Sequence, residues 1–192
     1  IKGLNLATCI STETLSIFDI LKKNNVFKKD RFFQIPNAIL ESTIKSKARP
    51  YEQRQNRIVV VGRIGAYQKN HELIFEALIK IKTLNGWTID FVGPIEEPFN
   101  HTIDQFFKNN EGYINVVRFL GNKNRDELME IYSSSKIFLL SSRWEGFSLA
   151  LVEAAYLGCY IITTEVGGAV EVTDNCNYGD IYEENELAEK LR

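Results

Sequence analysis

Residues 137–153 of this chain read Ile-Phe-Leu-Leu-Ser-Ser-Arg-Trp-Glu-Gly-Phe-Ser-Leu-Ala-Leu-Val-Glu. The apolar run at the start, Ile137–Leu140, is typical of a buried strand, and the apolar spacing over Leu149–Leu157 predicts a helix. Between them, Gly146 lets the backbone turn without a Cβ clash. The stretch therefore predicts a strand, a loop and a helix in succession, which is the repeating unit of a parallel α/β sheet.

Two carboxylates, Glu145 and Glu153, bracket the start of this predicted helix. The backbone N–H groups near Phe147, Ser148 and Leu149 are the unpaired donors of a helix N-terminus, which favours anions such as phosphate. Because carboxylates accept hydrogen bonds from hydroxyls, the segment suits a sugar nucleotide, which joins two hydroxyl-bearing rings through a diphosphate. On the residues alone an alternative stays open, in which Glu145 is a helix-dipole partner and Glu153 a solvated helix residue.

Strand and helix patterns alternate on both sides of this unit. Predicted strands are β-branched or aromatic runs at Ile58–Val61, Thr88–Val92, Asn115–Leu120, Ile137–Leu140 and Tyr160–Thr163. Predicted helices cover His71–Leu84, Thr102–Asn109, Arg125–Ser134 and Leu149–Leu157. This alternation predicts an α/β fold, a Rossmann-like doubly wound parallel sheet with helices on both faces. Such sheets bind ligands at the carboxyl ends of their strands, where Gly62, Gly93, Gly121 and Glu145 fall.

A second candidate for phosphate binding follows the first of these strands. Gly62-Arg63-Ile64-Gly65 and Lys69 offer a forked guanidinium donor and a point charge on one strand-to-helix loop. An ordinary surface loop is the alternative. The spacing matches neither the dinucleotide fingerprint nor the P-loop. The later pair Gly167-Gly168, with Glu171, is more typical of a turn than of a site.

Residues 1–56 lack this alternation. We expect a strand at Leu6–Ile10 and a helix at Thr14–Lys22. Extended chain is expected at Phe32–Asn37, because the residue before a proline avoids the α conformation. The polar segment Glu41–Asn56 contains a proline and is predicted to be a linker or a mobile loop.

Composition excludes several classes of function. The chain has 192 residues and a formal net charge of -2, which argues against nucleic-acid binding by bulk electrostatics. No apolar run approaches a membrane span, and no secretory signal opens the chain. Three cysteines and two histidines, His71 and His101, are not in metal-binding spacing, so no metal site is expected. Both histidines are predicted to be surface or helix-start residues. Because the chain opens on Ile1, we expect a piece of a longer protein.

These motifs together resemble the nucleotide-binding carboxyl-terminal half of retaining glycosyltransferases of family four, the group-one type with the GT-B fold. The resemblance covers roughly residues 35–190, and its most specific part is the pair of glutamates with the intervening Gly-Phe. It rests on Ile35–Ala38, Val61–Lys69, Val116–Gly121, Ser141-Ser142, Glu145–Glu153, Gly158 and Val166–Gly168. Ala38 and Asn70 depart from the glycines usual in the family, and neither change removes a charge.

The resemblance implies a role for each candidate residue. Arg63 and Lys69 would neutralise the pyrophosphate of the donor as the glycosidic bond breaks, with Gly62 in the same loop. Glu145 would contact the transferring sugar and Glu153 the ribose. The backbone amides of Gly146, Phe147, Ser148 and Leu149 would bind oxygens of the sugar and the phosphates. The backbone of Leu120, Gly121 and Asn122 would lie along the edge of the nucleobase.

The resemblance also implies a domain organisation and a set of partners. Residues 1–34 would end an amino-terminal acceptor domain, residues 35–56 would be the linker, and residues 57–192 would form the donor-binding domain, truncated before its last helix. The substrate would be a UDP- or GDP-sugar, with no cofactor, no metal and no nucleic acid. We expect a cytoplasmic hexosyltransferase, with peripheral association at the inner face of the membrane only through the missing domain, and no turnover by this piece alone. The alternatives are a sugar-nucleotide epimerase of the same fold and a non-catalytic nucleotide-sugar-binding module.

Overall fold

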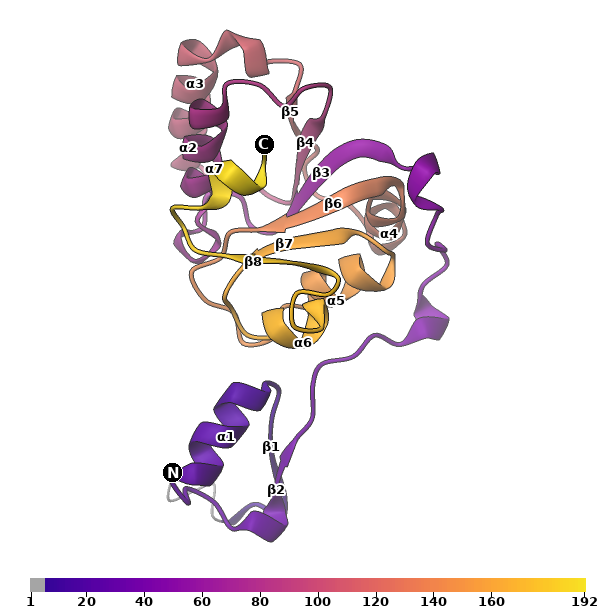
Figure 1. The fold of residues 1–192 in the computed structure, drawn as a ribbon, viewed down its shortest axis with the longest axis vertical. Helices are drawn as coiled ribbons and strands as arrows, with labels where there is room; N and C mark the ends of the chain where they lie inside the picture. Colours follow the sequence, from indigo (N-terminus) through magenta and orange to yellow (C-terminus); the bar gives the residue numbers. More distant parts are fainter. Residues whose placement is uncertain (1–5) are drawn as a thin grey trace.

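A computed structural model describes residues 6–192, and its centre is a six-stranded parallel sheet (Figure 1). The strands lie in the order β5-β4-β3-β6-β7-β8, and all neighbours run parallel. Their bounds are β3 Gln55–Val61, β4 Thr88–Val92, β5 Val117–Phe119, β6 Ser135–Leu140, β7 Tyr160–Thr164 and β8 Gly179–Tyr182. The predicted doubly wound parallel sheet is confirmed, and β6 lies inside it rather than at an edge.

Helices cover both faces of this sheet, and the core is split accordingly (Figure 1). One face carries α2 His71–Ile81, α3 Phe99–Asn109 and α7 Leu187–Lys190; the other carries α4 Arg125–Ser134, α5 Leu149–Tyr156 and α6 Ala169–Thr173. Successive residues of a strand point to opposite faces, so Val60 packs in the first core and Val59 in the second. Both residues are almost fully buried, which explains the continuous apolar run of β3.

Several boundaries differ from those predicted. β3 begins at Gln55 and β6 at Ser135, because the two strands pair at those residues even though their first positions are polar. β5 is shorter than expected, because residues 114–116 form a turn after the 3-10 helix Glu111–Tyr113. β8, α6 and α7 were not predicted. They are short and draw their stability from packing on the sheet, which local sequence patterns do not reveal.

The amino-terminal part forms a separate two-stranded parallel sheet, β1 Ile10–Thr12 with β2 Phe32–Gln34, and the helix α1 Leu15–Lys23 between them (Figure 1). The predicted helix is thus confirmed, whereas the strand expected at Leu6–Ile10 lies later. Residues 1–5 are outside the described part of the chain. The remaining 3-10 helices are Lys29–Arg31, Glu41–Thr43, Tyr51–Gln53 and Tyr67–Lys69.

Arg54 anchors the predicted linker to the large sheet. Its guanidinium is buried and donates to the carbonyl oxygens of Arg49 at 2.7 Å, Ser135 at 3.1 Å and Leu157 at 2.8 Å. The end of the linker is therefore held against the start of β6 and the end of α5. The assignment of residues 1–34 to another domain stays a prediction.

Two glycines allow the loops at the carboxyl rim of the sheet to approach each other. A Cβ at Gly93 would overlap the carbonyl oxygen of Gly62, and a Cβ at Gly167 would overlap that of Gly146. The loop after β4 therefore packs on the loop after β3, and the loop after β7 packs on the loop after β6. The pair Gly167-Gly168, predicted to form a turn, thus also allows the close contact between the loops after β6 and β7.

Candidate functional site

Lys69 and Glu145 form the centre of the rim. Lys69 ends the 3-10 helix that follows β3, and Glu145 lies on the loop that follows β6. The Lys69 Nζ lies 2.7 Å from Glu145 Oε1, and the two side chains are only 18% and 11% exposed. The Ser142 hydroxyl donates to Oε1 at 2.6 Å, and the Gln68 amide donates to Oε2 at 3.2 Å. Three donors therefore hold one carboxylate in a single orientation.

The backbone of the β3–α2 loop places the Lys69 side chain. A Cβ at Gly62 would lie 3.2 Å from Lys69 Cε, so the absence of a side chain there leaves the path of the lysine open. The Ser141 hydroxyl donates to the Lys69 carbonyl at 2.8 Å, and Asn70 then takes the left-handed conformation with φ of 51°. An asparagine tolerates this conformation better than most residues, so its presence after Lys69 keeps the turn that a glycine would also allow.

His71 shapes the same loop from beneath. It begins α2, as predicted, but it is buried and not a surface residue. Its Nδ1 accepts the backbone N–H of Gly65 at 3.1 Å, and its ring packs against Phe91 and Phe99. Burial, together with the nearby Lys69 charge, lowers the pKa of His71 to about 4. The neutral imidazole of His71 therefore accepts the Gly65 N–H and fixes the backbone of the loop Gly62–Lys69, the candidate for phosphate binding.

We expect His71 to make the protein labile to acid. Unfolded His71 binds a proton below about pH 6.5, whereas folded His71 stays neutral down to about pH 4, so stability falls as the pH drops through this window. The lost stability is at most about 3 kcal/mol. The substitution His71→Asn keeps an acceptor oxygen without a titrating ring. Urea unfolding at pH 7.5 and 4.5 should show a smaller loss for His71→Asn than for the natural protein.

Exposed His101 provides the matched control, since His101→Asn should leave the pH dependence unchanged. Equal acid lability of His71→Asn and the natural protein would show that this imidazole does not set the response.

Arg63 and Glu153 occupy ion pairs of their own. Arg63 is 65% exposed, and its Nη1 lies 3.6 Å from Glu96 Oε1. Glu153 lies in α5 with a largely buried side chain, and its Oε1 accepts from Arg125 Nη1 at 3.0 Å. Burial raises the pKa of the Glu153 carboxyl, and the Arg125 charge partly offsets this effect. The structure thus joins Lys69 directly to Glu145, whereas convergence of all four residues on one ligand stays a prediction.

The remaining candidates also lie at the rim. Leu120, Gly121 and Asn122 follow β5, and the Gly121 carbonyl accepts the Gly93 N–H at 2.9 Å. Ser148 is the N-cap residue of α5, makes no side-chain capping bond, and is followed by a first turn without acidic residues. Phe147 is buried, and its carbonyl accepts from Asn37 at 3.3 Å. The Ser148 N–H, expected to be an unpaired donor, instead donates to the Gly167 carbonyl at 3.4 Å, because the loop after β7 packs on the loop after β6. Anion binding by the other amides at the start of α5 stays a prediction.

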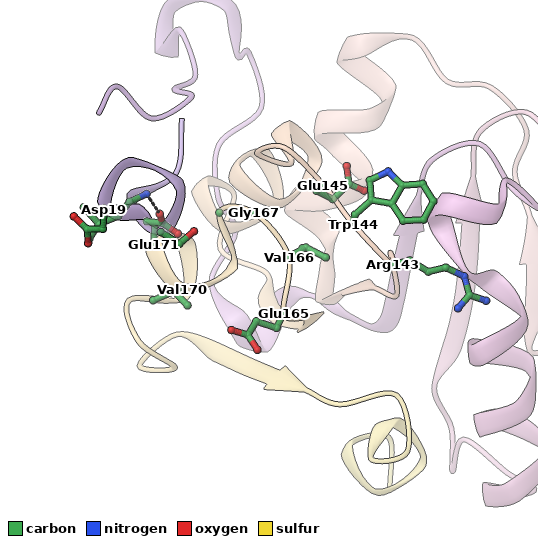
Figure 2. A pocket seen from close by; sticks show the side chains of 12 residues that line it. Asp19, Arg143, Trp144, Glu145, Glu165, Val166, Gly167, Val170 and Glu171 are labelled. Carbon is green, nitrogen blue, oxygen red and sulfur yellow. Dashed lines mark hydrogen bonds between the residues drawn. The ribbon is translucent and has the colours of Figure 1, made fainter. Parts of the chain in front are cut away.

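A cavity of about 500 Å³ opens beside Glu145 (Figure 2). One wall is the loop after β6, the second is the loop after β7 with the start of α6, and the third is α1. Its charged and aromatic lining comprises Asp19, Arg143, Trp144, Glu145, Glu165 and Glu171. In the described part of the chain no group of three or more His, Cys, Asp or Glu residues is arranged to hold a metal ion.

Sequence reasoning missed three contributors to this site. Gln68 and Ser142 orient Glu145, and Arg125 pairs with Glu153. Ser142 lies three residues before Glu145, which was an available signal, whereas Gln68 is 77 residues from Glu145 in the sequence. Arg125 comes from another element, α4, so only the folded chain reveals its contact.

Comparison with known proteins decides the family. The family model described as "Glycosyl transferases group 1" matches residues 41–192. The chain belongs to this family. Its six-stranded sheet has the Rossmann-like fold of one half of a GT-B protein, as predicted, and the solved structures share this fold. The Anabaena HepE structure in complex with UDP has a TM-score of 0.78 at 18% identity, covering 100% of this chain and 55% of that one. A GtfA/B complex has a TM-score of 0.76 at 18% identity, with coverages of 99% and 39%.

Curated relatives of this glycosyltransferase chain are longer than it is. It is 29% identical over 149 residues to the phosphatidylinositol N-acetylglucosaminyltransferase gpi3 subunit of Schizosaccharomyces pombe, covering 77% of this chain and 32% of that protein. It is 27% identical over 175 residues to a phosphatidylinositol N-acetylglucosaminyltransferase subunit of Arabidopsis thaliana, covering 89% and 38%. The chain therefore spans about a third of the length of these relatives. In its described part, the longest helices have 11 residues, and none has the length and hydropathy to cross a membrane.

Proposed function

We propose that this chain binds a nucleotide-diphosphate sugar, the donor substrate of a hexosyltransferase. The enzyme would transfer the hexosyl group to an acceptor with retention of the anomeric configuration. The observation that carries the proposal is the Lys69–Glu145 pair, held at the carboxyl rim beside the α5 N-terminus. Membership of the group 1 family supports a transferase. The cation and the helix amides suit the diphosphate, and the oriented carboxylate suits the hydroxyls and the developing positive charge of the sugar.

The proposed chemistry is electrostatic. As the bond between the sugar C1 and the phosphate oxygen breaks, negative charge grows on the diphosphate, and Lys69, Arg63 and the α5 amides stabilise it. The acceptor hydroxyl oxygen then bonds to C1, and its proton leaves with the diphosphate. Because these charges are fixed before the reaction, little reorganisation is needed when the charge develops. Glu145 contributes by holding the sugar and stabilising positive charge at C1.

We further propose UDP as the nucleotide and a glycan or lipid-linked saccharide as the acceptor. Support comes from the relatives, since one similar structure contains UDP and the curated relatives are named for transfer involving phosphatidylinositol. The amino-terminal acceptor domain would be supplied by the rest of the protein, and the 192-residue chain alone would bind donor without turnover. The place of action we propose is the cytoplasmic face of a membrane.

UDP should bind this chain more tightly than uridine, because the proposed contacts are mainly to the diphosphate. Lys69→Ala and Arg63→Ala should each remove a charge-assisted hydrogen bond and weaken UDP binding by roughly 1.5–3 kcal/mol, with little effect on uridine. Isothermal titration calorimetry measures both ligands. Lys80→Ala, an exposed lysine of α2, is the matched control and should bind UDP normally. Equal affinities for UDP and uridine would overturn the phosphate assignment.

A further inference from the structure

An exposed aromatic pair stands beside the Lys69–Glu145 centre. Tyr67 and Trp144 are 70% and 53% exposed, and their ring centroids lie 5.9 Å apart. The Arg143 guanidinium lies 4.6 Å from the centre of the Tyr67 ring. Large apolar side chains that stay exposed next to a reactive centre indicate a binding surface. We call Tyr67 and Trp144 the aromatic ledge.

The ledge is held in place by the same bonds that build the site. The Gln68 amide donates to the Trp144 carbonyl at 2.9 Å while it also reaches Glu145. The Arg143 backbone N–H donates to the Gln68 carbonyl at 2.8 Å, and its Nε donates to the Tyr67 carbonyl at 3.2 Å. These bonds join the loops after β3 and β6. Because the bonds fix the backbone of both ledge residues, mainly the side chains lose conformational entropy when a ligand binds.

Trp144 of the ledge lines the cavity of about 500 Å³, which is in the size range of small-molecule sites (Figure 2). Tyr67 stands behind Trp144 and is not part of the lining. Trp144 and Glu145 lie on one side of it, and Asp19 and Glu171 lie on the other. Its lining holds four carboxylates and one guanidinium. Carboxylates accept hydrogen bonds from hydroxyls and repel phosphate. An aromatic face with hydroxyl acceptors around it therefore suits an uncharged sugar ring.

The cavity shares Glu145 with the proposed donor contacts and extends away from the others. The nucleobase edge at Leu120–Asn122 follows β5, and Glu145 follows β6, which is three strands away in the sheet. Three strand spacings correspond to about 14 Å, which a nucleotide-diphosphate sugar can span. The cavity continues beyond Glu145 toward β7, α6 and α1. A donor laid from β5 to β6 leaves it open for a second substrate.

We propose that the aromatic ledge is the contribution of the donor-binding half to the acceptor site, beside the amino-terminal domain, and that the acceptor presents an uncharged saccharide ring there. The inference rests on the proposed function, since it takes Glu145 as the place of the transferring sugar. The C–H face of the acceptor ring packs on Trp144, with Tyr67 beside it, and ring hydroxyls donate to the carboxylates of the cavity. Trp144 and Tyr67 are thus specificity-determining residues contributed by the donor-binding half.

Saturation-transfer NMR on the complete protein, saturated with UDP, tests this assignment. The probes are methyl glucoside, methyl mannoside, N-acetylglucosamine and glucose 1-phosphate. At least one uncharged saccharide should receive saturation at its ring C–H protons, and more than glucose 1-phosphate does. Trp144→Ala should weaken its apparent binding by about 10-fold, which corresponds to about 1.4 kcal/mol. Trp144→Phe should restore part of it, and Tyr67→Ala should cause a smaller loss.

Tyr178→Ala is the matched control, because Tyr178 is 67% exposed and precedes β8 at the opposite rim. It should leave saccharide binding unchanged, and Trp144→Ala should leave the Kd for UDP unchanged. The ledge assignment is overturned if no saccharide receives saturation, if the signal survives Trp144→Ala, or if Trp144→Ala weakens UDP to the same degree. Failure of UDP itself to bind would instead overturn the proposed function.

Discussion

Glu145→Gln in the complete protein is expected to lower kcat by about 10²–10³-fold with little change in donor affinity. The carboxylate is held by Lys69, Ser142 and Gln68 in one orientation, so the amide keeps the shape and loses the charge. An interaction that strengthens only in the transition state affects kcat rather than binding. Steady-state kinetics with a UDP-sugar donor, once a turnover assay is in hand, gives both constants.

Glu153→Gln should behave differently. Glu153 pairs with Arg125 and is proposed to hold the ribose in the ground state and the transition state alike, so its loss should mainly raise the KM for donor. Glu76→Gln, on the exposed side of α2, is the control and should retain natural kinetics. Natural values for both Glu145→Gln and Glu153→Gln would mean that their ion pairs with Lys69 and Arg125 serve the fold and have no role in transfer.

Asp90→Asn is expected to destabilise the fold by about 3–5 kcal/mol, because it leaves buried guanidinium charge without a partner. Asp90 is fully buried in β4. Arg118 donates to it at 2.6 and 2.8 Å, and Arg57 Nε lies 3.0 Å away. Burial lowers the pKa of the Arg57 guanidinium, and the Asp90 charge opposes that effect. Urea unfolding should show a lower midpoint with an unchanged slope.

Asp180→Asn provides the comparison for this effect. Asp180 lies in β8 and pairs with Lys190 at 3.0 Å, but both side chains are about a third exposed. Exposed pairs contribute about 0–1 kcal/mol, so this substitution should change stability little. Similar losses for Asp90→Asn and Asp180→Asn would show that burial does not govern the strength of these pairs.

Much of the site was readable from local sequence, because strand-to-helix loops of a parallel sheet all end at one rim. Gly62, Lys69 and Glu145 each follow a strand, and the structure brings the lysine and the glutamate into contact. The partners of Arg63 and Glu153 were not readable. Glu96 and Arg125 come from other elements, and their contacts depend on which strands are neighbours.

The burial of His71 was also not readable from the sequence. In the sequence it is a polar residue at a helix start, where exposure is the ordinary expectation. Its burial follows from the packing of α2 against Phe91 of β4 and Phe99 of α3, and its role follows from the N–H of Gly65. A periodic pattern carries no information about which backbone group a single side chain meets.

The parallel α/β fold, the family and the loops that carry the candidate residues all follow from the linear sequence, because hydrophobic period and turn residues are local properties. The strand order, the pairing of Lys69 with Glu145, and the cavity between the aromatic ledge and α1 arise only in the folded chain. These features join segments separated by many residues along the chain. Their geometry depends on how the helices pack on the two faces of the sheet. The spacing of apolar and turn residues along the sequence does not specify this packing.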